Sequence, residues 1–80
     1  MVCAKVNKII AAMTESCMSP TEIAMAAGVS VNIVYRMRKG YLVKMEKFGK
    51  VCRVLGIEAK DYIDYERMEQ RKKETKENGK

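Results

Sequence analysis

The sequence predicts a small all-α domain. Its 80 residues include one proline, at position 20, and no run of alternating β-branched residues long enough for a sheet. Apolar residues instead recur at helical spacing, between small polar residues and glycines that suit helix ends. We therefore expect a compact five-helix domain over residues 1–65. A charged extension over residues 66–80, helical in part and frayed beyond Lys72, should follow it.

The first two helices have distinct signals. The first helix should end near residues 15–17 and is predicted by an apolar stripe of Val2, Val6, Ile9, Ile10 and Met13. The second should begin at Ser19, whose hydroxyl can accept from the amide of Glu22 while the Glu22 carboxylate accepts from the amide of Ser19. Pro20 fits the first helical position, where the amide hydrogen that it lacks would have no partner. Gly28 predicts the end of this helix.

Residues 19–40 meet the packing requirements of a helix-turn-helix. Ser30 predicts the start of a third helix over residues 31–39, and Gly40 predicts its end. Because only Val29 separates this start from Gly28, the two helices must cross steeply. The crossing needs a small residue, the turn needs one that tolerates positive φ, and the inner faces need apolar side chains. The seven residues that meet these needs are Ile23, Ala24, Ala27, Gly28, Val29, Val34 and Met37.

Two further helices complete the predicted domain. The fourth spans residues 44–55, ends at Gly56, and has an apolar face formed by Met45, Phe48, Val51, Cys52 and Leu55. The fifth should begin near residues 58–59 with Asp61 in its first turn, where a negative charge is favourable. It should bury Tyr62 and Ile63, and Tyr65 is a further candidate for burial.

Positive charge is concentrated in the middle of the chain. The net charge is +6, and residues 36–53 contain seven cations opposed by Glu46 alone. After Tyr65, in contrast, six cations alternate with four acids. This distribution indicates a polyanionic partner for the middle of the chain.

Other features argue against catalysis and membrane insertion. The chain has no histidine, no CxxC pair and no glycine-rich phosphate loop, so we expect no enzyme, metal site, cofactor or small-molecule ligand. The three cysteines should pack as small apolar residues in a reducing cytoplasm. Lys5, Asn7 and Lys8 interrupt the first apolar stretch, so it is predicted to be neither a signal peptide nor a membrane span.

Residues 19–40, together with residues 43–57 and their Leu55-Gly56-Ile57 end, resemble the Cro/CI-type (Xre-like, lambda-repressor-like) helix-turn-helix family. The resemblance covers about residues 2–65. It implies a five-helix DNA-binding domain, usually dimeric, that regulates or represses transcription in bacteria, phages and mobile elements. It also implies a place in the bacterial cytoplasm, on the nucleoid when bound. The fifth helix could form a homodimer seam through Tyr62, Tyr65 and Met68.

Two positions depart from that family's pattern. Cys17 stands where the family often has glycine at the end of the first helix, so this turn should differ locally. Pro20 stands where many members have a glutamine that grips a phosphate and a base, and proline cannot make that contact. Backbone amides at the helix start could still face a phosphate.

By similarity, Val31, Asn32 and Arg36 match the base-contacting positions of the family. Asn can bond adenine, Arg can bond guanine, and Val can pack on a thymine methyl group. Ile33 and Tyr35 either add groove contacts or pack on neighbouring helices. The candidates for phosphate contact are Thr21, Ser30, Lys39, Tyr41 and Lys44.

The sequence thus predicts a sequence-specific regulator that binds double-stranded DNA through residues 31–39. The alternative is a protein-interaction module on the same fold, which would use Val31, Ile33 and Tyr35 against a partner protein. Lys47, Lys50 and Arg53 lie farther along the fourth helix and should face solvent.

Overall fold

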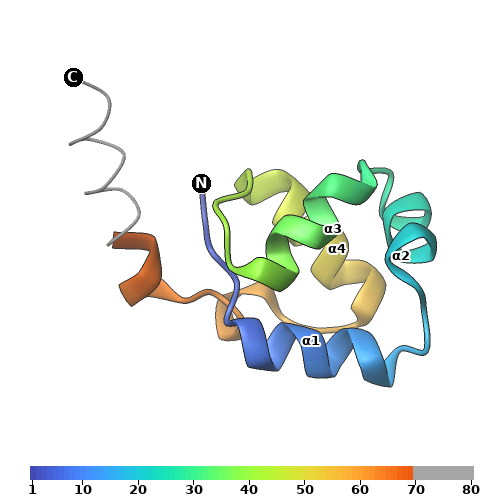
Figure 1. The fold of residues 1–80 in the computed structure, drawn as a ribbon, viewed down its shortest axis with the longest axis horizontal. Helices are drawn as coiled ribbons and strands as arrows, with labels where there is room; N and C mark the ends of the chain where they lie inside the picture. Colours follow the sequence, from blue (N-terminus) through green and yellow to red (C-terminus); the bar gives the residue numbers. More distant parts are fainter. Residues whose placement is uncertain (70–80) are drawn as a thin grey trace.

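The computed structural model describes residues 1–69 and confirms the all-α class. Its elements are α1 (Val6–Glu15), α2 (Pro20–Ala27), α3 (Val31–Lys39), α4 (Met45–Leu55) and the short 3-10 helix η1 (Ala59–Asp61) (Figure 1). Residues 65–69 are again helical. The fraying expected beyond Lys72 lies outside the described residues.

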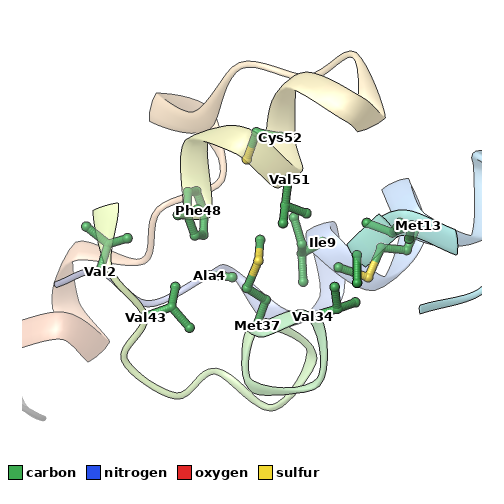
Figure 2. Close-up of a cluster of buried hydrophobic side chains, with 12 residues drawn as sticks. Val2, Ala4, Ile9, Met13, Val34, Met37, Val43, Phe48, Val51 and Cys52 are labelled. Atoms are coloured by element: carbon green, nitrogen blue, oxygen red, sulfur yellow. The ribbon is translucent and has the colours of Figure 1, made fainter. Parts of the chain in front are cut away.

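The four α-helices share one apolar core. Ile9 of α1, Ile23 of α2, and Val34 and Met37 of α3 are fully buried. Phe48, Val51 and Cys52 project from α4 into the same cluster (Figure 2). Among the described residues no polar or charged side chain is buried. The fold is therefore stabilised mainly by apolar burial.

The start and the end of α2 are as the sequence predicts. The Oγ of Ser19 accepts from the amide of Glu22 at 3.2 Å, and Glu22 Oε1 accepts from the amide of Ser19 at 2.9 Å. Two hydrogen bonds with Ser19 lower the pKa of Glu22. The bond from the Ser19 amide has the larger effect, and the bond with the Ser19 side chain has the smaller one. Gly28 ends the helix in the left-handed conformation, with φ 71°. Local capping therefore fixes both ends of this helix.

The prediction for the N-terminus is wrong in one respect, because Val2 does not lie on α1. Residues 2–4 are extended, and Val2 pairs with Val43 through two backbone hydrogen bonds of 2.8 and 2.9 Å. Ala4 pairs with Ile63, and the amide of Asp64 donates to the carbonyl of Cys3 at 2.8 Å. The extended path buries Val2, Cys3 and Ala4 together. All three can be buried because this segment is flanked by Val43, which pairs with Val2, and by Ile63, which pairs with Ala4.

The fifth helix also differs from its prediction. Residues 59–61 form one 3-10 turn, and α-helix resumes only at Tyr65, after Ile63 has paired with Ala4. Asp61 lies in the first turn of the 3-10 helix, as expected, and Asp64 caps the segment from Tyr65, since its Oδ1 accepts from the amide of Arg67 at 3.0 Å. Pairing with the extended N-terminal residues thus divides the predicted helix. Tyr65, a candidate for burial, is 57% exposed at the start of the second part.

Met45 also differs from its prediction, and Cys17 shows the local difference expected at its turn. Met45, assigned to the apolar face of the fourth helix, is 66% exposed because it lies in the first turn of α4, away from the core. Cys17 has φ 58° and is the one non-glycine residue in the described chain with positive φ. The local difference expected at Cys17 is therefore a cysteine in the conformation that favours glycine.

Candidate nucleic-acid interface

The crossing of α2 and α3 determines which face of α3 is exposed. The amide of Val29 donates to the carbonyl of Ala24 at 3.0 Å, which closes the turn after α2. Ala24 of α2 is buried, as are Val34 and Met37 on the inner face of α3. The opposite face of α3, which lies beside α2 (Figure 1), is consequently exposed.

Polar and aromatic side chains cover this exposed face. Asn32 and Arg36 form one i, i+4 row, and Tyr35 and Lys39 form a second row beside it. All four side chains are exposed, and together with Tyr41 they line one surface depression. The structure therefore brings two predicted base-contacting residues, Asn32 and Arg36, next to two predicted phosphate-contacting residues.

The apolar residues of α3 divide differently. Val31 and Ile33 are half-buried and pack against the core, whereas Tyr35 is 44% exposed. For Ile33 the structure supports the packing alternative. Tyr35 remains available on the outer face, and Val31 offers only part of its surface there.

The helix starts nearest this face carry hydroxyl groups. Ser30 occupies the N-cap of α3, but its hydroxyl makes no capping hydrogen bond, unlike that of Ser19. Thr21 is exposed in the first turn of α2, and Lys44 is exposed at the N-cap of α4. Helix N-termini present backbone amides to anions, so these positions suit phosphate contacts.

Arg36 makes an interaction that its position on the exposed face did not predict. Its Nε and Nη2 atoms donate to the carbonyl oxygen of Leu42, at 3.1 and 2.8 Å. The same guanidinium lies 5.8 Å from the centre of the Tyr41 ring. No sequence signal could have found this contact, because its acceptor is a backbone carbonyl placed by the path of the loop.

The positive charge beside α3 is not neutralised by carboxylates within the described residues. Within residues 1–69, the ion pair of the structure joins Lys60 to Glu58 at 3.3 Å. Both side chains are largely exposed, and neither belongs to α3 or to the loop that follows it. Lys50 and Arg53 are exposed on α4, as expected, and Lys47 is half-buried. The exposed face of α3 is thus a surface of one charge sign.

The described residues show neither a metal cluster nor a membrane-spanning helix. Residues 1–69 contain no cluster of three or more metal-binding side chains and no helix long and apolar enough to cross a membrane. Burial raises the pKa of the Cys52 thiol to about 11, so this cysteine is neutral near pH 7 and packs as an apolar residue.

A steep crossing of two short helices that exposes one cationic face of the second defines a helix-turn-helix DNA-binding domain. The chain matches the Cro/C1-type HTH DNA-binding domain over residues 8–68, and it belongs to this family. No curated protein and no solved structure shows significant similarity to it. The resemblance identified from residues 19–40 is confirmed.

Proposed function

We propose that the protein is a transcription regulator that binds specific double-stranded DNA by placing α3 in the major groove. The observation that carries this proposal is the division of α3 into two faces. Val34 and Met37 are fully buried on one face, while Asn32 and Arg36 are exposed on the other. A major groove about 12 Å wide accommodates one helix whose outer side chains reach the base edges.

In this proposal the side chains of α3 have separate roles. Asn32 bonds the N6 and N7 atoms of adenine, and Arg36 bonds the O6 and N7 atoms of guanine. Val31 packs its exposed part on a thymine methyl group, and Tyr35 adds a groove or backbone contact. Each well-formed bidentate pair contributes about 1–3 kcal/mol of discrimination against another base.

Phosphate contacts on both sides of α3 would set the register on the duplex. Thr21 and Ser30 lie at the helix starts, and Lys39, Tyr41 and Lys44 lie at the end of α3 and beyond it. These groups recognise the backbone, so they contribute affinity and salt dependence without base preference.

The regulator would act as a homodimeric repressor in the bacterial cytoplasm. Of the three residues proposed for its seam, Tyr62 and Met68 pack on their own domain, whereas Tyr65 is 57% exposed. Tyr65 is therefore the residue best placed to contact a second copy. A dimer that binds two half-sites would occupy a palindromic operator and exclude polymerase from it.

The structure gives less support to the protein-interaction alternative. That function would need an apolar surface on α3, but Val31 and Ile33 are half-buried in the domain itself. What remains exposed is a tyrosine among polar and cationic groups. We therefore favour binding to DNA, without catalysis, as the activity of this face.

Selection of bound sequences from random duplexes tests this function. Recovery of a palindromic site, with binding at least a hundredfold tighter than to random duplex at the same salt, would establish specific dimeric recognition. Binding that depends steeply on salt but shows no sequence preference would contradict specificity. Absence of binding at low salt would contradict DNA binding altogether.

A further inference from the structure

The loop that follows α3 is held to the domain at each of its first three residues. The amide of Tyr41 donates to the carbonyl of Arg36 at 2.9 Å, which closes the end of the helix. Val43 is held on the other side by its two backbone hydrogen bonds with Val2. Between these backbone anchors, the carbonyl of Leu42 is held by the side chain of Arg36, at 2.8 and 3.1 Å.

Arg36 suits this task for two reasons. A planar guanidinium donates from two nitrogens to one oxygen, and its charge strengthens both hydrogen bonds. The Tyr41 ring, 5.8 Å away, adds a cation–π contact that holds the group over the loop. The loop so held carries Tyr41 and Lys44, which are both candidates for phosphate contact.

We propose that Arg36 is a positioning residue for residues 41–44, in addition to its role towards the bases. By fastening the Leu42 carbonyl, it orders the loop before DNA arrives, so that Tyr41 and Lys44 meet the backbone at a lower entropic cost. This inference rests on the proposed function, since it concerns contacts with the same duplex.

The same arrangement restricts how Arg36 can contact a base. A guanidinium has five N–H donors. Two of them, the one on Nε and one on Nη2, donate to the carbonyl of Leu42. The two donors of Nη1 and the second of Nη2 remain for guanine. A side chain already held in place would thus contact guanine through its Nη1–Nη2 edge while it still bonds the loop.

Arg36→Lys tests the positioning role on random duplex, where no guanine contact contributes. Lysine keeps the positive charge, but it lacks the planar pair of donors for Leu42. The matched control is Arg38→Lys, the same change two residues away, where the side chain lines a groove with Ile10 and Tyr35. Because Arg36 is exposed, its replacement should shift the melting temperature by only a few degrees.

We expect Arg36→Lys to lower the backbone NMR order parameters of residues 41–44 in the DNA-free protein. It should also weaken binding to random duplex about three- to tenfold, and binding to the selected site by at least that factor, because lysine also lacks the planar donor pair for guanine. Arg38→Lys should change each affinity less than twofold and leave the loop unchanged.

Two results would overturn the proposal: order parameters that stay unchanged in Arg36→Lys, or a loss of affinity confined to the selected site. If the wild-type chain bound no duplex, the proposed function would fail. The relaxation of the DNA-free loop would then still decide whether Arg36 fixes it.

Discussion

A Cβ atom placed on Gly40 would lie 2.9 Å from Cγ2 of Val6. The backbone where α3 ends therefore packs directly on the first residue of α1. Gly40 also has φ 75°, a left-handed conformation that favours glycine whatever the space around it. Gly28 has a similar φ of 71° at the end of α2, but a Cβ there would meet nothing within 4 Å. The two glycines thus separate the effect of backbone conformation from that of close packing.

We expect Gly28→Ala to lower the free energy of unfolding by about 1 kcal/mol, the cost of a left-handed alanine. Gly40→Ala should lower it by about 3 kcal/mol, because overpacking against Val6 adds to the same backbone cost. Urea unfolding of the two variants measures both values. Equal losses would show that the contact with Val6 yields without cost.

At Cys17 the opposite substitution, of a larger residue by glycine, should stabilise the fold. It holds a left-handed conformation, φ 58°, with an exposed side chain. Cys17→Gly should raise the free energy of unfolding by about 1 kcal/mol, because glycine adopts this conformation without a Cβ clash. Cys17→Ala is the control, since it removes the thiol but keeps the Cβ. The explanation from backbone strain would be refuted if the alanine variant were as stable as the glycine variant.

The capping box should make α2 sensitive to acid. Hydrogen bonds with Ser19 lower the pKa of Glu22 from its ordinary value of 4.5 in the folded state. The stabilisation from the ionised carboxylate is therefore fully present above about pH 4.5 and is lost as the pH falls through the lowered pKa. Glu22→Gln keeps an acceptor but does not titrate.

Urea unfolding at a series of pH values tests this prediction. The difference in stability between wild type and Glu22→Gln should be constant near neutral pH and should shrink as the pH falls below about 4.5. A difference that stayed constant into acid would mean that ionisation of Glu22 contributes nothing to the cap.

Local signals predicted the helices well, and long-range pairing accounts for the errors. The helix ends at Ser19, Gly28 and Gly40 are formed by hydrogen bonds between residues three to five positions apart, so they could be inferred from sequence. The bridges Val2–Val43 and Ala4–Ile63 join segments that are distant in the chain. An apolar residue such as Val2 suits either a helix stripe or a buried strand, and only the folded chain decides between them.

The same distinction applies to the candidate site. Helical spacing from the buried Val34 and Met37 sufficed to place Asn32 and Arg36 on the outer face. It could not predict that Ile33 packs on the core, which depends on the angle between helices. Nor could it predict the bonds from Arg36 to Leu42, which depend on where the loop turns.

Asn32 gives the sharpest test of base recognition. It is exposed on the outer face of α3 and lines the same depression as Arg36. Asn32→Ala should remove the preference for adenine at one position in each half-site and weaken the selected site by about 1–3 kcal/mol. Binding to random duplex should change little. Selection from random duplexes measures the preference, and an equal loss on all sequences would contradict a base contact.

Lys39 should behave in the opposite way. It is exposed at the last position of α3, beside Tyr35 and Arg36 but beyond the residues assigned to bases. Lys39→Ala should weaken binding to selected and random duplexes by the same factor, because a phosphate contact carries no base preference. One fewer neutralised phosphate should also reduce the slope of log K against log salt by about 1.

Titrations at four salt concentrations determine that slope for both duplexes. Lys50→Ala, on the exposed face of α4, is the matched control and should leave the slope unchanged. A slope that falls equally in both variants would assign the effect of Lys39 to overall charge rather than to a contact at the end of α3.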